Sequence, residues 1–484
     1  MSVEERRSAV PPSDRRALIA IDLGAESCRV SLLRWHEEQP VIELVHRASN
    51  APIENGDALE WDIARIEREI DTGLRRAAML ATEGVRSIAV DGWAVDYARL
   101  DADGHLLANP RCYRDPRNVA AQAAVHLLLP PDRLREITGL QLLSINTLYQ
   151  LYADQLAGFS QARWLNLPEY ILYRLGARQI AEYTNATHTQ LLHQRTRDWS
   201  PEIFDRLGLD RSAAATIVPP GARVGTLAPP LGDLPSLRGA ELIAPACHDT
   251  ASAVAGIPAH GDDWAYISSG TWSLVGTVLH CPIDTPEARE KNYTNLGAVG
   301  GRICFHRNVN GMWLIRQSID EWRSRGREWT VAELIAAAET LPAPTALIDV
   351  DEPELLLPGN IPARINAQLA RRGLAPLDES PDNAPAFASL IFHSLAARYA
   401  QVLADISRIA TRTFTRLYIV GGGSRNTFLN RLTAEATGLQ VICGAPESST
   451  IGNFAVQLAS LEEGADPRTG VTAEATASWA ALLQ

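Results

Sequence analysis

Runs of apolar residues in the first fifty positions predict a sheet that opens with three strands. Residues 17–22 form a short apolar run that ends at a carboxylate, and residues 29–35 and 41–47 follow as further strand-like segments. The polar segment before residue 17 shows no periodicity and is expected to be a loose tail.

The hydrophobic period changes after residue 62. Five apolar residues at helical spacing predict a helix, and the β-branched run at 85–90 predicts a strand that ends at Asp91. The strand delivers the polar sequence DGWAVDY to its carboxyl end, where ligands collect in open α/β sheets. The predicted helix face is Ile63, Ile66, Ile70, Leu74 and Ala77.

The opening pattern recurs in the second half of the chain. IDLGAESCRVSLL, from Ile21, can be laid over ISSGTWSLVGTVL, from Ile267, and the two begin about 246 residues apart. Each has an apolar strand, a Gly-x-x-Ser turn and another apolar strand. The repeat predicts duplicated domains that face one another across a cleft. A chance pairing of two glycine turns is the alternative.

A second α/β pattern follows after residue 390. A strand at 417–420 runs into three glycines at 421–423, a helix is expected from Asn426, and a strand at 439–443 follows. Residues 447–450 are expected to cap a last helix. This strand–glycine loop–helix–strand order is a common scaffold for a nucleotide. The preceding helix has an apolar face made of Ile391, Leu395, Tyr399, Val402 and Ile406.

Composition excludes several classes of protein. The chain has 484 residues, which suits two domains, and a formal net charge of −12, which disfavours nucleic-acid binding. Its six cysteines include no CxxC pair, so neither a zinc module nor a disulfide framework is expected. We find no apolar run of about 18 residues and no signal-peptide core, so a cytoplasmic protein without a membrane span is expected.

Two glycine turns are candidates for phosphate binding. Asp22 leaves a strand just before Gly24 and can hold Mg²⁺ directly or through water, while the turn N–H groups and the Ser27 hydroxyl can face phosphate oxygens. The loop at 268–273 is rich in small hydrogen-bond donors. Together the two turns suggest a two-sided phosphate clamp. A plain hairpin, with an Asp that accepts turn N–H bonds, is the alternative for the first turn.

The glycines at 421–423 and the sequence CHDT at 247–250 are the next candidates. Three glycines at a strand end let backbone lie flat against a purine or ribose, although neither a Walker A loop nor a GxGxxG fingerprint is present. A tight turn is the alternative. Asp249 is expected at the start of a helix, either as a base that accepts a hydroxyl proton during phosphoryl transfer or as a simple N-cap.

Acids, amides and an indole gather in segments that suit a polyhydroxylated sugar. These groups supply hydrogen bonds to hydroxyls and a stacking face for C–H groups. Each segment alone is also compatible with an ordinary surface loop. The segments are Asp91, Trp93 and Asp96, YRDPRN at 113–118, and EYTNATHT at 182–189.

Taken together and in order, these segments resemble the FGGY carbohydrate kinases and, within them, the rhamnulokinase branch. The likeness runs from about residue 17 to 462. DLGAESCRV and YISSGTWSLVG resemble the two phosphate motifs of the family, VGGGSRN its adenosine motif, and ESSTIGNFAVQLA the segment that follows. WAVDY, NTLYQL, EYTNATHTQLL, HDTASAV and SSGTWSL are similar to the branch.

The resemblance implies an α/β fold of two duplicated actin/hexokinase-like (ribonuclease H-like) domains flanking a cleft. Residues 17–256 would form the sugar and phosphate side, and residues 257–462 the nucleotide side. ATP and a sugar would meet in the cleft, with Mg²⁺ held partly through Asp22. The protein would be a monomer or a homodimer.

The resemblance also implies individual site residues. Asp249 would be the proton acceptor. Sugar contacts would come from Ala94, His248, Asp249, Thr250 and Asn308, and ATP contacts from Ala25, Glu26, Ser27, Cys28, Arg29, Thr271, Arg316 and Gly422. Four positions depart from the family pattern: Cys28 and Ala94 replace glycines, Arg316 a glutamine and Gly92 a threonine. These departures affect the identity of the sugar and leave the reaction type unchanged.

The expected reaction is ATP-dependent phosphorylation of L-rhamnulose at O1, which gives L-rhamnulose 1-phosphate and ADP. Kinases for another ketose, such as L-fuculose, a pentulose or a linear dihydroxy-ketone, remain alternatives of the same class. A non-catalytic sugar or nucleotide sensor and an actin-type ATPase are the alternatives from other classes. An ATPase would not need the sugar-facing cluster at 91–96.

Overall fold

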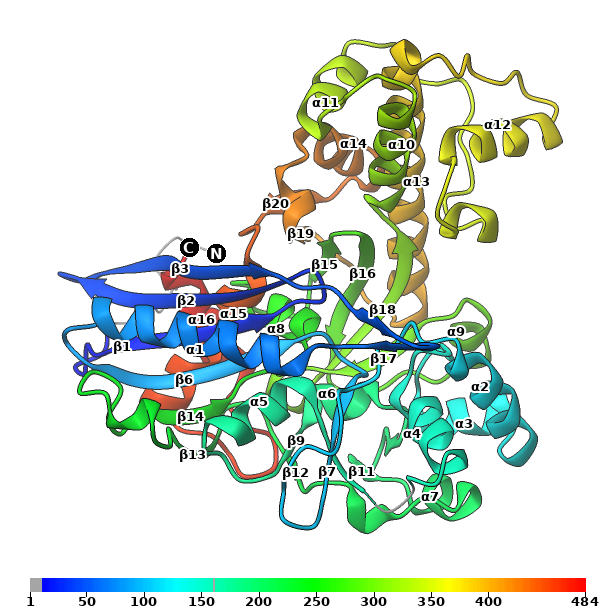
Figure 1. The fold of residues 1–484 in the computed structure, drawn as a ribbon. Helices are drawn as coiled ribbons and strands as arrows, with labels where there is room; N and C mark the ends of the chain where they lie inside the picture. The colour runs from blue at the N-terminus through cyan, green and yellow to red at the C-terminus, as the bar shows by residue number, and fades with distance from the viewer. Residues whose placement is uncertain (1–10, 160–161) are drawn as a thin grey trace. The chain divides into compact units, whose positions relative to one another are not determined.

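A computed structural model describes residues 11–159 and 162–484, so the beginning of the predicted N-terminal tail lies outside the described residues. By its internal contacts the chain forms two units (Figure 1). Unit 1 contains the residues up to His260, Val278–Phe305 and Ser448–Gln484. Unit 2 contains Gly261–Thr277 and His306–Glu447. The domain boundary at 256/257, which the resemblance implies, stays a prediction.

Unit 1 is built on a six-stranded sheet of order β13-β14-β6-β1-β2-β3. The three predicted opening strands are confirmed as an antiparallel meander, β1 to β3, and the predicted strand β6 lies parallel to β1. β14 is parallel to β6, and β13 forms an antiparallel edge. The strands are β1 Ala17–Leu23, β2 Ser27–His36, β3 Gln39–Ser49, β6 Val85–Gly92, β13 Ala222–Thr226 and β14 Glu241–Ala244.

Helices cover both faces of this sheet (Figure 1). On one face lie α1 (Ile63–Leu80) and α5 (Leu167–Leu175), and the predicted apolar face of α1 is buried there. The helix approaches so closely that a Cβ on Gly73 would lie 2.4 Å from Val30. On the other face α15 (Ser448–Glu462) contacts β1 and β6. The central strands β1 and β6 are therefore buried on both sides, as their continuous apolar sequences require.

A second core in unit 1 gathers short helices and strands around buried aromatic and aliphatic side chains, among them Tyr149, Trp164 and Phe204. The helices of this part and its surroundings are α2 Arg117–Leu128, α3 Pro131–Thr138, α4 Thr147–Leu156, α6 Tyr183–His188, α7 Pro201–Leu207, α8 Asp249–Ala255 and α9 Pro286–Glu290. The short strands are β4 Ile53–Asn55, β5 Ala58–Glu60, β7 Tyr97–Leu100, β8 Arg163–Asn166, β9 Ala181–Glu182, β10 Leu192–His193, β11 Asp198–Trp199 and β12 Ile217–Val218.

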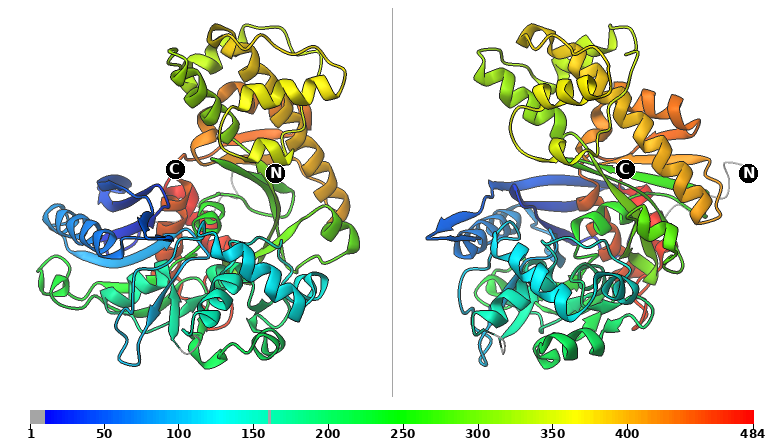
Figure 2. Two further views of the ribbon diagram at one scale, coloured as in Figure 1. Left: turned by 45° about the vertical axis from the view of Figure 1, so that its right-hand side comes forward. Right: turned by 90° about the vertical axis from the view of Figure 1, so that its right-hand side faces the viewer.

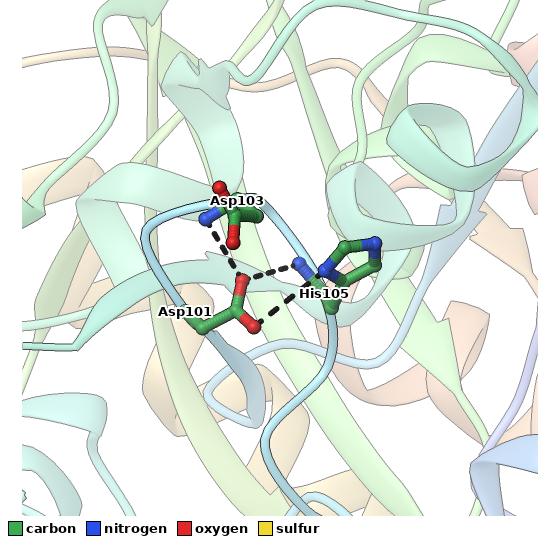
Figure 3. Close-up of side chains that lie close together, drawn as sticks. All are labelled: Asp101, Asp103 and His105. Carbon is green, nitrogen blue, oxygen red and sulfur yellow. Dashed lines mark hydrogen bonds and ion pairs between the residues drawn. The ribbon is translucent and has the colours of Figure 1, made fainter.

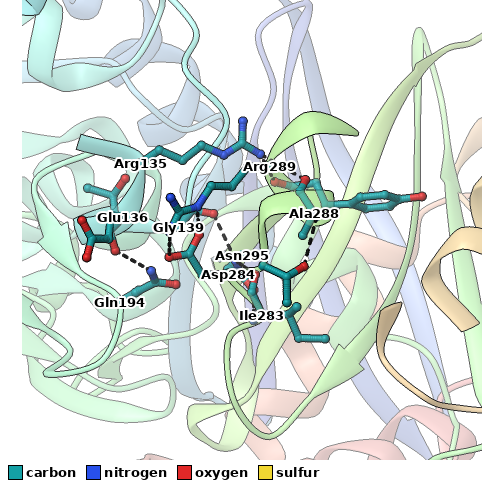
Figure 4. Close-up of polar contacts among 12 residues, drawn as sticks. Arg135, Glu136, Gly139, Gln194, Ile283, Asp284, Ala288, Arg289 and Asn295 are labelled. Carbon is teal, nitrogen blue, oxygen red and sulfur yellow. Dashed lines mark hydrogen bonds and ion pairs between the residues drawn. The ribbon is translucent and has the colours of Figure 1, made fainter. Parts of the chain in front are cut away.

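Polar contacts fix the segment Val278–Phe305 to the rest of unit 1 (Figure 4). The Asn295 amide donates to the carbonyl of Gly139 (3.1 Å), and its side-chain oxygen accepts the N–H of Ile283 (2.9 Å). The Arg135 guanidinium donates to the carbonyl of Tyr293 (2.7 Å). The bond between Asn295 and Ile283 lies within the segment, and the bonds to Gly139 and from Arg135 hold the segment against α3.

The second sheet has the order β17-β18-β16-β15-β19-β20. β15 is antiparallel to β16 and parallel to β19, which repeats the pairing of β1 with β2 and β6 and confirms the predicted duplication. β17 belongs to unit 1, and β16 and β18 run from one unit into the other. The strands are β15 Trp264–Ser269, β16 Trp272–Leu279, β17 Thr294–Gly297, β18 Ile303–Asn310, β19 Arg416–Val420 and β20 Gln440–Cys443.

The predicted helices of unit 2 are present. The apolar face of α13 is buried, and Asn426 caps α14 by accepting the N–H of Leu429. Helix α13 lies against α11 and α14 (Figure 2). The helices of the unit are α10 Trp313–Ser324, α11 Val331–Glu339, α12 Ile361–Arg371, α13 Ala384–Ile409 and α14 Thr427–Thr437.

One expectation about the C-terminus was wrong. The helix predicted from residues 447–450 is α15, but it is not the last, because α16 (Ala473–Leu482) follows in unit 1. Thr472 caps α16 by accepting the N–H of Ala475. This helix is rich in alanine and lacks a distinct polar face, so its sequence carries little periodic signal. Within the described residues, no helix has the length and apolar character needed to cross a membrane.

Candidate active site

Two carboxyl groups end neighbouring parallel strands of unit 1. Asp22 on β1 and Asp91 on β6 are register partners, so their side chains lie on the same face of the sheet. Asp22 accepts hydrogen bonds from Arg29 Nη1 (2.9 Å) and Ser449 Oγ (3.0 Å). Asp91 is fully buried, and burial, followed by the charge of Asp22, raises its pKa well above the usual range. The two strand ends thus bring two carboxyl groups together, one ion-paired with Arg29 and the other with its neutral form favoured.

Helix α15 presents a polar stripe to this end of the sheet. Asn453 Nδ2 donates to Asp91 Oδ1 (2.6 Å), and Gln457 Nε2 donates to Asn453 Oδ1 (2.8 Å) and to the carbonyl of Ile19 (3.1 Å). Ser449, Asn453 and Gln457 are four residues apart and therefore share one helix face. The sequence analysis missed this role, although three polar residues at a four-residue spacing in an apolar helix were a usable signal.

Asp249 opens helix α8 in unit 1. The N-cap residue is His248, so Asp249 is not the N-cap that the alternative interpretation proposed. Its Oδ1 lies 3.2 Å from Thr250 Oγ1 and 3.4 Å from His248 Nε2. Of its side chain, 37% is exposed. Loss of solvation in the surrounding protein, followed by the charge of Asp22, nevertheless raises the pKa of Asp249 to about 7. A carboxyl group with this pKa is matched to taking a proton near neutral pH.

The end of β6 approaches the residues before Asp249. The N–H of Gly92 donates to the carbonyl of Cys247 (2.9 Å), and Gly92 forms a parallel bridge with His248. A Cβ at position 92 would lie 2.5 Å from the carbonyl oxygen of Leu23. The departure from threonine at this position therefore reflects a close approach of two backbones, and no larger residue fits without a shift of β1.

Asp96, which sequence reasoning placed among the sugar-facing residues, serves the fold of its own loop. It is fully buried, and Oδ2 accepts from the indole N–H groups of Trp61 (2.6 Å) and Trp93 (3.0 Å). Oδ1 accepts from Gln150 Nε2 (3.0 Å), and the N–H of Tyr113 also donates to Oδ2 (3.2 Å). Four protein donors orient this carboxylate, so it holds the loop that carries Ala94.

Ala94 lies beside a residue with an unusual backbone. Val95 has a φ of +75°, a region that β-branched residues rarely adopt. Its carbonyl accepts hydrogen bonds from Thr147 Oγ1 (2.7 Å) and Gln150 Nε2 (3.2 Å), which hold this conformation. Thr147 and Gln150 of the NTLYQL segment thus fix the backbone next to Ala94, a residue that is 7% exposed.

The carbonyl groups of the turn between β1 and β2 are fixed by hydrogen bonds from Asn50. Gly24 N–H donates to the carbonyl of Ser27 (3.0 Å), while Asn50 donates through Nδ2 to the Gly24 carbonyl (3.1 Å) and through N–H to the Glu26 carbonyl (2.8 Å). Because N–H and C=O of a trans peptide point in opposite directions, the Ala25 N–H points away from Asn50. Asn50 is a residue that sequence reasoning missed.

The departure at Cys28 carries no backbone cost. Cys28 lies in extended β2, paired with Leu23 and Ala48, and it is not among the residues with positive φ. A positive φ, which would favour glycine at this position, is therefore not used here. Arg29, the next residue of β2, forms the ion pair with Asp22 described above.

Unit 2 places Thr271 in the turn between β15 and β16. The N–H groups of Met312 and Trp313 donate to the carbonyls of Gly270 and Thr271 (both 3.1 Å). The carbonyl groups of this turn are therefore also fixed by hydrogen bonds. Arg316 is exposed in the first turn and a half of α10, and Asn308 is half-buried on β18.

The glycine run of unit 2 lies beside the same strand end. A Cβ on Gly423 would lie 2.0 Å from Ser269 Oγ, and Gly421 has a φ of +82°. By contrast, apart from its chain neighbours, no heavy atom of the described residues lies within 4 Å of a Cβ placed on Gly422. The outer two glycines are therefore required by packing, and Gly422 is the one with open space, which fits a flat ligand.

A group of possible metal ligands lies elsewhere, in the loop after β7. Asp101, Asp103 and His105 come close together at an exposed tip (Figure 3). The carboxylate of Asp101 accepts the N–H groups of Asp103 (2.9 Å) and His105 (2.8 Å). The turn itself uses this carboxylate, and we assign no site to it.

Comparisons with known proteins give the family. The profile of the N-terminal domain of the FGGY family of carbohydrate kinases matches residues 17–256, and the profile of its C-terminal domain matches residues 265–461. The chain belongs to the FGGY family of carbohydrate kinases. It is therefore a phosphotransferase that acts on a sugar hydroxyl, which confirms the coarse activity that the motifs predicted.

Curated relatives agree with this assignment. A rhamnulokinase from Enterococcus faecalis is 37% identical over 461 residues, which cover 93% of this chain and 90% of the relative. One from Bacteroides thetaiotaomicron is 34% identical, with 93% and 92% covered.

Two solved structures share the fold. A xylulose kinase from Lactobacillus acidophilus superposes with a TM-score of 0.76 at 17% identity and 96% coverage of both chains. A glycerol kinase from Plasmodium falciparum, solved with ADP, gives 0.75 at 11% identity, with 97% and 93% covered. The predicted fold class, two mixed α/β domains each with a central sheet, is confirmed.

Proposed function

We propose that this FGGY kinase transfers the γ-phosphoryl group of ATP to O1 of L-rhamnulose. The observation that carries the proposal is Asp249, a partly exposed carboxyl group at the start of α8 with a pKa of about 7, next to the strand ends that hold Asp22 and Asp91. The curated relatives at 34–37% identity support rhamnulose as the sugar.

In this proposal Asp249 orients the sugar hydroxyl and accepts its proton. The proton moves from the hydroxyl oxygen to a carboxylate oxygen of Asp249 as the oxygen bonds to phosphorus and the bond to the ADP oxygen breaks. The transition state of phosphoryl transfer is loose, so correct placement supplies much of the rate. His248, Thr250 and Ala94 of unit 1 and Asn308 of unit 2 are proposed to bind the sugar.

ATP is proposed to contact both glycine turns. In unit 1 the Ala25 N–H, turned away from Asn50, would face a phosphate oxygen, and in unit 2 Thr271 would do the same. Gly422, with open space above it, would face the adenosine. The remaining proposed ATP contacts are Glu26, Ser27, Cys28, Arg29 and Arg316.

Magnesium fits the donor set at the strand ends. Carboxylate oxygens are preferred Mg²⁺ ligands, and the charge of Asp22 raises the pKa of both Asp91 and Asp249, so a cation there would relieve repulsion. Asp91 Oδ2 is buried without a hydrogen-bond partner among the described residues. We propose that Asp22 holds Mg²⁺ directly or through water. When bound, the ion neutralises negative charge on the phosphate oxygens.

The test is ADP release, measured by a coupled assay, over a panel of ketoses and polyols. L-rhamnulose is expected to stimulate release most, and Asp249→Asn is expected to lower kcat at least about 1000-fold with little change in sugar affinity. Asp101→Asn is the matched control, since it changes a turn carboxylate outside the site. Failure of every sugar to stimulate release, or near-normal turnover of Asp249→Asn, would contradict the proposal. Release that does not depend on sugar would indicate an ATPase.

A second sugar is favoured by one observation. Ala94 has a methyl group where the resemblance implies glycine, and the fixed Val95 backbone prevents it from moving away. One methyl group in a tight pocket changes substrate preference by roughly 1–3 kcal/mol. L-fuculose and pentuloses are therefore included in the panel, and a higher kcat/KM for one of them would replace rhamnulose in the proposal.

A further inference from the structure

Glu182 and Thr184 hold the backbone immediately before Asp249. Glu182 Oε2 accepts the N–H of Cys247 (2.9 Å) and the hydroxyl of Thr184 (2.5 Å). Thr184 Oγ1 in turn accepts the N–H of His248 (3.3 Å). The two consecutive N–H groups before Asp249 therefore both end on one Glu–Thr pair. We call residues 247–249 the base loop.

The carbonyl groups of the base loop are held as well. The Cys247 carbonyl accepts from the N–H of Gly92 (2.9 Å), and the His248 carbonyl accepts from the N–H of Ser252 (2.9 Å). Since each peptide is planar, fixing the N–H and C=O groups on both sides of His248 fixes the two peptide planes that place the Asp249 Cα.

Glu182 is itself fixed by a second buried acid. Glu169 Oε1 accepts the N–H of Glu182 (3.1 Å), and Glu169 Oε2 accepts from Asn185 Nδ2 (2.9 Å). Glu169, Glu182, Thr184 and Asn185 are all fully buried. Buried acids and amides that bond to one another in this way form a rigid polar network, because an unpaired member would be costly.

The C-terminal end of α6 contacts the side chain of His248 in the base loop. The ring of His188 lies edge-on to the ring of His248, with centroids 4.7 Å apart and an interplanar angle of 70°. His248 Nε2 is 3.4 Å from Asp249 Oδ1. The segment from Glu182 to His188 therefore contacts both the backbone of the base loop and the imidazole that neighbours the base.

We propose that Glu182 and Thr184 are positioning residues for Asp249. They do not touch the reacting groups. They set the place of the carboxylate through the N–H groups of Cys247 and His248. The inference rests on the proposed role of Asp249 as the proton acceptor. It assigns a function to the EYTNATHT segment that differs from the direct sugar contact expected from its composition.

Thr184→Val is the sharpest test, because it keeps the shape of the side chain and removes the hydroxyl. In the full-length enzyme, with ATP and L-rhamnulose, we expect kcat to fall about 10- to 100-fold, since a displacement of about 1 Å at a reacting group has effects of this size. The KM for the sugar should change less than about threefold, and the acid limb of the pH–kcat profile should move. Thr184→Ser, which retains the hydroxyl, should recover kcat to within about threefold.

Thr138→Val is the matched control. Thr138 is also a buried threonine of unit 1, and its hydroxyl donates to the carbonyl of Leu134 (2.9 Å) at the end of α3. This variant should lose a similar amount of thermal stability and keep kcat and the pH profile. A merely structural role of Thr184 predicts that the two variants behave alike.

The outcomes separate this inference from the proposed function. A wild-type enzyme that no ketose stimulates would overturn both. The positioning role alone would be overturned if the wild type is active, Asp249→Asn is inactive and Thr184→Val has a normal kcat and pH profile. An equal loss of kcat in Thr138→Val would also overturn it.

If Thr184→Val does not fold, Glu182→Gln replaces it. The amide keeps one oxygen as an acceptor, and kcat should fall about 3- to 10-fold with the same shift of the acid limb.

Discussion

The two glycine turns repeat one sequence pattern but differ in charge and in tolerance. In unit 1 the turn follows Asp22, which is paired with Arg29, whereas in unit 2 the corresponding positions are Ser268 and Val275. A Cβ on Gly24 would lie 2.8 Å from the carbonyl of Ser27, but a Cβ on Gly270 would lie 3.7 Å from the carbonyl of Trp272. The charge and the steric limit are thus both concentrated in the turn of unit 1.

The way the two turns are supported also differs. One polar side chain and its backbone N–H, both from Asn50, hold the carbonyls of the first turn, and two backbone N–H groups at the start of α10 hold those of the second. Both turns have their carbonyl groups fixed by hydrogen bonds, but the donors differ. The two copies of the motif therefore share a backbone shape and differ in the side chains around it.

The largest expected difference concerns the charge of the first turn. Asp22→Asn should lower kcat/KM by about 100-fold or more, because it removes the carboxylate proposed to hold Mg²⁺ and the charge that pairs with Arg29. Ser268→Ala, at the corresponding position of unit 2, should change kcat/KM less than about threefold. Steady-state kinetics as a function of Mg²⁺ concentration would measure both. Equal losses in the two variants would show that the turns are not specialised.

The next prediction concerns pH and separates the two units. Activity should fall about tenfold per pH unit below pH 7, since Asp249, with a pKa of about 7, must be ionised to accept a proton. Stability should follow the opposite course. Burial raises the pKa of Asp96 to about 6, of Glu169 to about 7 and of Glu182 to about 8, all in unit 1.

Because the folded state binds these protons more tightly than the unfolded chain, their contribution is present at low pH and is lost as pH rises through 6 to 8. In unit 2, the described carboxyl groups with shifted values, Asp263 and Glu333, have a lowered pKa through bonds with Arg416 and with Thr330, so they add nothing in this window. Calorimetry should give a higher Tm at pH 6 than at pH 8, and hydrogen exchange should assign the difference to unit 1. A difference confined to unit 2 would contradict this.

Periodicity and motif order predicted the strands and helices that carry the site, and they placed Asp22, Asp249 and Gly422 at element ends. These features are local, because a strand that stops at a polar residue is visible within ten positions. The supports were not predictable in the same way. Asn453 reaches Asp91 across 362 residues and Glu182 reaches Cys247 across 65, so these pairs depend on how elements pack.

Asp96 shows the limit from the other side. Its residue type suited a sugar ligand, and only the structure reveals that two indoles, an amide and a backbone N–H surround its carboxylate. A sequence records which side chains have hydrogen-bonding capacity. Whether that capacity is used inside the fold or offered to a ligand depends on three-dimensional neighbours.

Steric tolerance gives a smaller effect. Gly24→Ala should destabilise the protein by about 1–3 kcal/mol, because the new methyl group would press on the carbonyl of Ser27 inside a short turn. Gly270→Ala has room and should change stability by less than about 0.5 kcal/mol. Urea denaturation of both variants would measure the difference. An equal destabilisation would show that the second turn is as constrained as the first.

The two serines that close the turns give the smallest and most specific comparison. Ser273 Oγ lies 2.7 Å from the hydroxyl of Tyr399, and both residues are buried, so Ser273→Ala should cost about 1 kcal/mol of stability and leave the KM for ATP unchanged. Ser27→Ala should do the reverse. Its hydroxyl is proposed to bond a charged phosphate oxygen, and loss of such a bond should raise the KM for ATP about tenfold with little change in Tm. Kinetics as a function of ATP concentration and thermal melts on the two variants would show whether Ser27 binds the nucleotide while Ser273 stabilises the fold. Equal effects on the KM for ATP would contradict this difference.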